Sequence, residues 1–183
     1  MTRDTAGKTF VARLCLLGLV LLIASCATPA REFRVSKQNM EAVREAPANL
    51  TLGSFTGSID RVGCRAESIS AGKDATFASY IRDAFAKVIQ TSKVTDKEST
   101  IELSGSLKEI ELDCAYSNTG TWNIEMDFAV DGKEPFSIRV VQLFNGHIVA
   151  VNVFQNALEG LILAVQKIVD DVLESEQIQT AAR

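Results

Sequence analysis

The feature that most constrains the fold is a strict alternation of apolar and polar or small residues over 122–130. The apolar members are Trp122, Ile124, Met126, Phe128 and Val130. Such alternation places every second side chain on the same face of a β-strand. Asp131-Gly132 then predicts a hairpin turn, and a returning strand is expected from Phe136 to about Phe144. The segment therefore predicts an antiparallel pair with one buried face.

Two earlier segments also alternate, less regularly. Residues 50–62 predict a strand with an irregularity, because the parity of the apolar positions changes and two glycines interrupt it. Residues 101–114 predict a strand whose parity shifts near Lys108–Glu109, which indicates a bulge. The Gly- and Ser-containing residues 63–74 between them are expected to form a loop.

Two segments have helical spacing. Residues 75–91 carry one apolar stripe, with Asp74 as the expected N-cap. Residues 153–173 form a second helix with a broad apolar face, and acidic residues gather at its C-terminal end. Acids there oppose the helix dipole, so fraying is expected after about Ser175. Residues 147–153 are compatible with either a strand or the start of this helix.

The predicted order is strand, helix, strand, strand, strand, helix. A helix between two strands implies a right-handed parallel crossover, and the hairpins add antiparallel strands. The expected fold is therefore α/β (α+β): a two-layer sandwich with a mixed sheet of about four to five strands and two helices on one face.

The N-terminus has the order of an export signal. Residues 1–13 have a net positive charge, and Leu14 to Ala24 follow as eleven uncharged residues. This apolar run is too short for a membrane-spanning helix, which needs about 20 residues. Its order of charged, apolar and small residues is typical of a secretory signal peptide.

Residues Ile23-Ala24-Ser25-Cys26 resemble the lipobox of bacterial lipoproteins. The resemblance implies cleavage between Ser25 and Cys26 and attachment of acyl chains to Cys26. More than one acyl chain gives stable membrane attachment. In such lipoproteins an Asp after the cysteine often causes inner-membrane retention. Ala27 stands there, so we expect an outer-membrane anchor with the domain facing the periplasm.

The expected organisation is a signal peptide over 1–25, a lipidated N-terminus with a flexible tether over 26–48, and one periplasmic domain over 49–183. The whole chain has a net charge of −4 and the leader one of +2 (Arg3, Lys8 and Arg13 against Asp4), so the mature chain has −6. An acidic domain argues against nucleic acid as a partner. The mature chain has a single histidine, His147, which argues against a Cys/His metal site.

Two further cysteines follow the anchor, Cys64 and Cys114. If the first two strands are parallel neighbours, their C-terminal ends are adjacent and a disulfide is geometrically feasible. An oxidising compartment favours the pair. Two buried free thiols are the alternative.

No arrangement of residues indicates catalysis or a cofactor. Glu109, Glu111 and Asp113 alternate on one face of a strand, as an acid/base pair would require, but a solvated face explains them more simply. His147 follows Asn145-Gly146 and is interpreted as an exposed turn residue. The sequence contains no nucleophile motif and no phosphate-binding glycine loop. We expect neither an enzyme nor a metal protein.

Several stretches resemble a family of small proteobacterial envelope lipoproteins of unknown function. They are Cys64-Arg65, residues 76–85, 103–107 and 120–124, and 164–167. The resemblance extends more loosely to YajG-like lipoproteins and to accessory lipoproteins of envelope transport systems. Members of the family often place a second cysteine where this chain has Phe154. The resemblance therefore leaves the partner of Cys64 open between Cys114 and none, and it brings no catalytic residues.

Two functions follow as hypotheses. The first is a non-catalytic accessory or assembly factor that binds another envelope protein, for instance through a sheet edge. The second is a lipid- or glycan-binding protein with a cleft between sheet and helices. A deep apolar pocket would favour the ligand, whereas a bare strand edge or an apolar patch would favour a protein partner.

Overall fold

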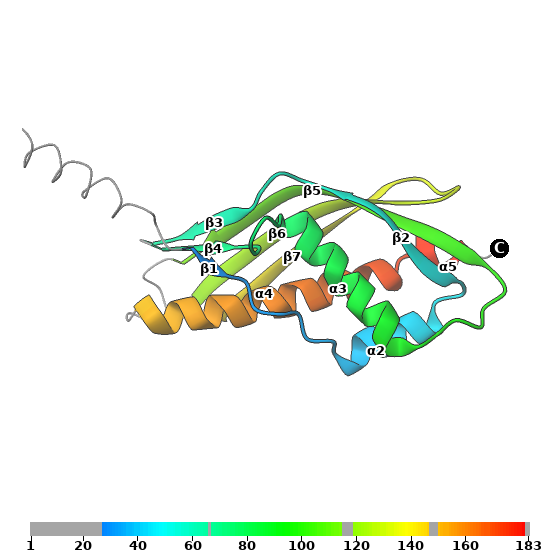
Figure 1. The fold of residues 1–183 in the computed structure, drawn as a ribbon, viewed down its shortest axis with the longest axis horizontal. Helices are drawn as coiled ribbons and strands as arrows, with labels where there is room; N and C mark the ends of the chain where they lie inside the picture. Colours follow the sequence, from blue (N-terminus) through cyan, green and yellow to red (C-terminus); the bar gives the residue numbers. More distant parts are fainter. Residues whose placement is uncertain (1–26, 66, 115–118, 147–149, 182–183) are drawn as a thin grey trace, which may run out of the picture.

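The computed structural model describes residues 27–65, 67–114, 119–146 and 150–181 (Figure 1). The main sheet has the order β2-β5-β6-β7. Its strands are β2 (Asn49–Thr56), β5 (Thr100–Asp113), β6 (Thr119–Val130) and β7 (Phe136–Asn145). The helices are α2 (Lys37–Glu45), α3 (Phe77–Ser92), α4 (Ala150–Leu173) and the short α5 (Glu176–Gln179).

The predicted topology is confirmed. β2 and β5 are parallel and are connected through α3, while β5, β6 and β7 form successive antiparallel pairs. Helices α3 and α4 lie on the same face of the sheet, which makes a two-layer sandwich (Figure 1). The register shifts between Leu52 and Phe55 and between Leu107 and Glu109, where the sequence indicated irregularities.

A second, smaller sheet replaces the loop expected over 63–74. It has the order β1-β4-β3, with β1 (Thr28–Pro29), β3 (Arg61–Cys64) and β4 (Glu67–Ser70). The expectation of a loop is wrong because β3 and β4 pair as a tight antiparallel hairpin, in which Val62 lies opposite Ile69. Both side chains are buried, so this small sheet shares the hydrophobic core.

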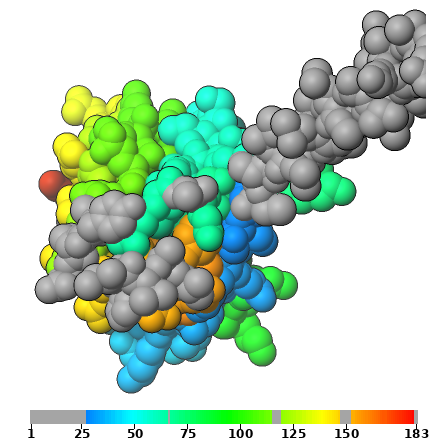
Figure 2. Space-filling view, turned by 90° about the vertical axis from the view of Figure 1, so that its left-hand side faces the viewer, coloured from blue at the N-terminus to red at the C-terminus, as the bar shows by residue number. Residues whose placement is uncertain are grey.

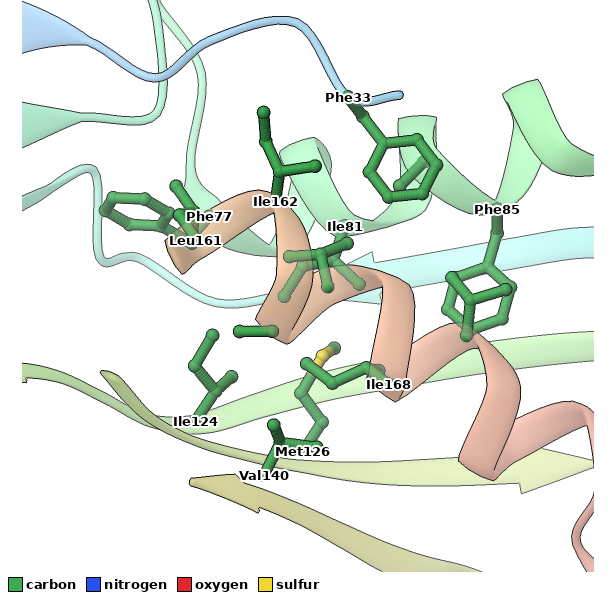
Figure 3. Packing of buried hydrophobic residues seen from close by; sticks show 14 of the residues in the cluster. Phe33, Phe77, Ile81, Phe85, Ile124, Met126, Val140, Leu161, Ile162 and Ile168 are labelled. Atoms are coloured by element: carbon green, nitrogen blue, oxygen red, sulfur yellow. The ribbon is translucent and has the colours of Figure 1, made fainter. Parts of the chain in front are cut away.

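The core lies between the main sheet and helices α3 and α4. Figure 3 shows Ile168 of α4 beside Met126 of β6, with Val140 of β7 next to them. All three are fully buried. The side chain of Trp122 is also buried, and its Nε1 donates to the carbonyl oxygen of Ala157 at 2.8 Å. The strictly alternating strand therefore faces α4, as its pattern predicts.

The N-cap of α3 is Thr76, not Asp74. The Thr76 side chain accepts a hydrogen bond from the Ser79 backbone N–H, and the Ser79 side chain accepts one from the Thr76 backbone N–H. This reciprocal capping box satisfies two donors that the helix leaves open. Asp74 lies two residues earlier with a left-handed backbone, φ 57°. The prediction missed the cap because Ser79 can take the role usually held by Glu or Gln.

The chain before the domain is not a flexible tether over its described part, residues 27–48. Thr28 and Pro29 pair in parallel with β4, and the backbone N–H of Ala30 donates to the carbonyl oxygen of Ser70 at 2.7 Å. Phe33 is buried in the core, and Figure 3 shows it on the side of α4 that carries Ile162. The expected tether is therefore wrong here, because this segment covers the helices and is bonded to them.

Helix α2 completes this segment. Its N-cap Ser36 forms a capping box with Asn39, which is fully buried. The Asn39 Nδ2 donates to the carbonyl oxygen of Gln166 at 3.0 Å and to Asp170 Oδ1 at 2.6 Å, both on α4. Burial raises the pKa of Asp170, and the Asn39 hydrogen bond acts in the opposite direction. Asn39 thus fastens α2 to α4.

The structure of the C-terminal region answers two questions, whether residues 147–153 form a strand or a helix and whether the chain frays after Ser175. Residues 150–153 belong to helix α4, whereas 147–149, with His147, lie outside the described residues. The chain does not fray after Ser175, because the Ser175 side chain caps α5 by accepting from the Ile178 N–H. Ile178 is fully buried and holds this short helix against the domain.

Cys64 and Cys114 form a disulfide, with 5.4 Å between their Cα atoms. Cys64 is the last residue of β3, and Cys114 directly follows β5. Arg65 Nε donates to the Cys114 carbonyl oxygen at 3.0 Å beside it. The bond therefore joins the small sheet to the main sheet. The expected pairing is confirmed, although Cys64 reaches Cys114 from the small sheet and not from the end of β2.

Candidate functional site

The residues singled out in the sequence fall into two groups. Ser25, Cys26 and His147 lie outside the described residues. The acidic residues of β5 lie on the sheet face away from the helices. There Arg139 is 3.9 Å from a Glu109 carboxylate oxygen and 3.8 Å from one of Glu125, with all three side chains partly exposed. This face has the arrangement of a solvated polar surface.

The same polar character continues across the face. Lys108 Nζ lies 2.8 Å from Asp127 Oδ2, and the Ser137 hydroxyl donates to Asp127 Oδ1 at 2.7 Å. These two partners lower the pKa of Asp127, so the carboxylate stays ionised. In the part of the chain that the structure describes, no group of His, Cys, Asp and Glu side chains is placed to hold a metal ion. Nor does any described helix have the length and apolarity needed to cross a membrane.

Side chains fill the space between sheet and helices, where a cleft for a ligand is expected. Phe77, Trp122, Phe128 and Leu161 occupy it, each at most 1 % exposed. A hollow of about 660 Å³ does exist elsewhere, beside β1, but polar residues such as Asp60, Arg61 and Lys73 line it. The structure thus gives no support at this place to an apolar ligand.

The edge of the sheet formed by β7 has a different character. Among the described residues, no strand pairs with the outer side of β7. Val140 and Phe144 face the helices and are buried, whereas Val141 and Leu143 point to the opposite face and are 57 % and 60 % exposed. A ten-residue strand with an open edge and exposed apolar side chains is a surface that pairs readily with another chain.

Helix α4 adds a third apolar residue to this margin. Leu163 is 49 % exposed, and it borders two shallow hollows. One, of about 260 Å³, also touches Leu143 and Asn145; the other, of about 460 Å³, also touches Gln142. Val141, Leu143 and Leu163 are the large apolar side chains that stand exposed in the described parts of the chain. We call these three residues with the outer side of β7 the β7 margin.

Two contacts hold this margin in place. Phe144 packs against Gly160 of α4 so closely that a Cβ there would lie 3.1 Å from the Phe144 side chain. Asn156 Nδ2 donates to the carbonyl oxygen of Asn145 at 2.7 Å. A small residue at 160 therefore lets the end of β7 lie directly on α4. The exposed side chains of Val141 and Leu143 thus belong to a strand that α4 holds in place.

The sequence carried a signal for this site that the strand prediction did not use. In β7 the alternation is broken by two adjacent apolar pairs, Val140-Val141 and Leu143-Phe144. One member of each pair must face away from the core, because successive side chains point to opposite faces. Leu163 has no comparable signal, since it lies within a helix that is apolar around most of its surface.

No family model and no curated protein matches this chain. Among solved structures, the chain is similar to the crystal structure of a protein from Xanthomonas campestris assigned to the family DUF330. The similarity has a TM-score of 0.53 at 12 % sequence identity, and it covers 81 % of this chain and 95 % of that chain. At this identity the comparison establishes the fold alone. The neighbour comes from a proteobacterium, and its family is one of unknown function.

Proposed function

We propose that this chain is a non-catalytic envelope lipoprotein, anchored to the outer membrane through Cys26, that binds an extended segment of another envelope protein along the β7 margin. The lipobox-like residues 23–26 support the anchor, and the fold of a proteobacterial protein of unknown function is compatible with the resemblance noted in the sequence. The proposal includes neither a metal nor a cofactor.

The β7 margin is the observation that carries the proposal. An open strand edge offers backbone N–H and C=O groups that a second strand can pair with, and flanking side chains provide selectivity. Val141 and Leu143 lie on one side of that edge and Leu163 on the other. A partner strand with apolar residues at adjacent positions would therefore cover apolar surface on both sides, because successive side chains point to opposite faces. Burying the exposed part of one such side chain would contribute roughly half of the 1.5–3 kcal/mol that complete burial gives, because these residues are about half exposed.

The test is affinity purification of the native lipoprotein from its own membranes after mild crosslinking. The test variant is Val141→Lys with Leu143→Lys, because lysine on an edge strand opposes pairing. Both positions are more than half exposed, so the two substitutions together should change the unfolding free energy by about 1 kcal/mol or less. The matched control is Ser54→Lys, an exposed position on β2, the opposite edge of the sheet.

We expect wild type and the Ser54→Lys control to bring down the same stoichiometric envelope protein, and the double variant to lose it. A protein that emerges alone in every case contradicts the proposal. So does a partner that the double variant retains at wild-type level. Recovery of a bound lipid or glycan in place of a protein would instead support the ligand-binding hypothesis.

A further inference from the structure

We infer that the small-sheet end of the domain, formed by β1, β3, β4 and residues 71–76, rests directly on the membrane surface. This inference depends on the lipid anchor at Cys26 that the proposed function includes. Its starting point is the position at which the fixed part of the chain begins. Thr28 already pairs with Ile69 of β4, so only Ala27 lies between the anchor Cys26 and a strand of the domain, a distance of two residue steps along the chain.

Chain length decides how far the domain can move from its anchor. Two extended residues span about 7 Å. A free tether over 26–48 would instead give a root-mean-square reach of about 25 Å. The reach of the free tether exceeds that of the two extended residues by more than about 10 Å, which is the spacing between two packed layers of a protein. The two-residue linkage keeps one end of the domain at the lipid headgroups, whereas the free tether would allow the domain any orientation.

The bonds along the segment show that the two-residue linkage applies. The Tyr80 hydroxyl, on α3, donates to the carbonyl oxygen of Arg31 at 2.9 Å. Lys87 Nζ, also on α3, donates to the Phe33 carbonyl oxygen at 2.9 Å. Gln166 Nε2, on α4, donates to the Arg34 carbonyl oxygen at 2.6 Å. Side chains from two helices thus hold the backbone of this segment.

Side-chain pairs and burial strengthen the attachment. Arg31 and Arg34 both form ion pairs with Glu159 of α4. Tyr80 is largely buried where it meets the segment, and burial raises its pKa to about 12. Releasing the segment would expose Phe33 and break these contacts together. The free-tether state is therefore disfavoured by several contacts at once.

The figures show which surface this anchoring turns toward the membrane. In Figure 1, β1, β3 and β4 lie at one end of the long axis, and the β6–β7 turn lies at the other. Figure 2 looks onto the first end, where the small-sheet residues (teal) lie beside the start of the N-terminal segment (blue). The strands of the main sheet run between the two ends, and the part of β7 that carries Leu143 lies toward the first end, because Leu143 pairs with Thr121 and Thr121 pairs with Asp113, next to Cys114 of the disulfide.

Charge at this end is balanced. The hollow beside Ala27 is lined by Arg61 and Lys73 but also by Asp60 and Asp74. Balanced charges give little net attraction to anionic lipid, which depends on clustered basic residues. The short lipid linkage holds the surface on the membrane, and the contact should therefore not depend on anionic lipid.

The test uses the lipidated full-length protein in phosphatidylcholine vesicles that contain a headgroup-labelled nitroxide lipid. A fluorophore is attached at Lys73→Cys, at the small-sheet end, or at Glu134→Cys, in the β6–β7 turn; both positions are exposed. We expect strong nitroxide quenching at position 73 and none at 134, unchanged when phosphatidylglycerol replaces part of the lipid. A flexible Gly-Ser insertion between Ala27 and Thr28 should remove the quenching at 73.

Equal quenching at both positions, or none at 73 in a lipidated protein, overturns the inference. So does quenching at 73 that survives the insertion. Failure of the anchor itself is distinguished by two measurements. Mass spectrometry shows whether Cys26 carries acyl chains, and vesicle flotation of Cys26→Ser shows whether attachment depends on it. An unlipidated wild type would contradict both the anchor and the inference.

Discussion

The two edges of the main sheet are built differently. The β2 edge has a register shift between Leu52 and Phe55, and its exposed side chains, such as Thr51 and Ser54, are polar. Arg82 Nε of α3 also donates to the Gly53 carbonyl oxygen at 3.4 Å. The β7 edge keeps its register with β6 over all ten residues and exposes Val141 and Leu143.

Natural sheets commonly protect an edge with bulges, polar side chains or a covering element. The β2 edge has these features, whereas the β7 edge has no register shift and exposes Val141 and Leu143, with α4 packed on its buried face and bonded to its end at Asn145. The same domain therefore closes one edge and leaves the other suitable for pairing. This contrast between the two edges is the reason to propose a partner on β7.

The largest expected effect concerns the disulfide, which lies on the small-sheet side of β5. The double variant Cys64→Ala with Cys114→Ala should lower the unfolding free energy by about 4 kcal/mol, because the bond closes a loop with a sequence separation of 50. Denaturant titration measures this loss of unfolding free energy.

The same variant also tests whether the β7 margin depends on the small-sheet side of the domain. If it does not, the folded variant should still capture the partner through β7. A folded variant that loses capture would show that the contrast between the edges is wrong.

A smaller effect is expected from Gly160→Val, which places a side chain against Phe144. Overpacking of this kind typically costs about 1–3 kcal/mol. Hydrogen exchange of β7 amides should rise more than that of β2 amides, because the change acts on the end of β7. The matched control is Gly63→Val, since nothing lies within 4 Å of a Cβ built at Gly63. Equal protection loss at both edges would contradict the assignment of Gly160 to the β7 margin.

The smallest expected effect is a pH dependence at Asp170, near the hollow bordered by Leu163. Burial raises the pKa of this carboxyl in the folded protein. The folded state then binds the proton more strongly than the unfolded state, so this stabilising contribution is complete below the ordinary pKa. It is lost as the pH rises through the raised folded-state pKa.

Asp170→Asn should remove that dependence while keeping an oxygen for Asn39. The unfolding free energy of the variant minus that of wild type should therefore increase from acidic to neutral pH, by on the order of 1 kcal/mol for each unit of pKa shift. Chemical denaturation across this pH range measures the difference. A difference that does not change with pH would show that Asp170 has no raised pKa in the folded state.

The elements with clear periodicity were predictable, and those held by particular tertiary contacts were not. The β5–β6–β7 meander and the two long helices follow from alternation and helical spacing. The small sheet was missed because its strands have only four residues or fewer, with Gly63 inside one of them. Strands that short carry too few positions for a periodic pattern to be distinguished from a loop.

The N-terminal segment was misjudged for a different reason. Its sequence is polar, and the bonds that hold it come from Tyr80, Lys87 and Gln166, which lie far away in the chain. One signal was present, namely the apolar face of the last helix, which is broader than contact with one sheet requires. Phe33 and Asn39 of the N-terminal segment cover the part of the α4 surface that the sheet leaves uncovered. The candidate site likewise left a trace, in the two adjacent apolar pairs of β7.

The most direct test of the central claim is site-specific photo-crosslinking in living cells of the source organism. A photoreactive amino acid is introduced at Leu143 of β7 and, in a separate strain, at Ser54 of β2; both side chains are exposed. The account predicts a discrete crosslinked adduct with a second envelope protein from position 143 and none from position 54. Adducts of equal intensity from both positions, or an adduct from position 54 alone, would contradict it.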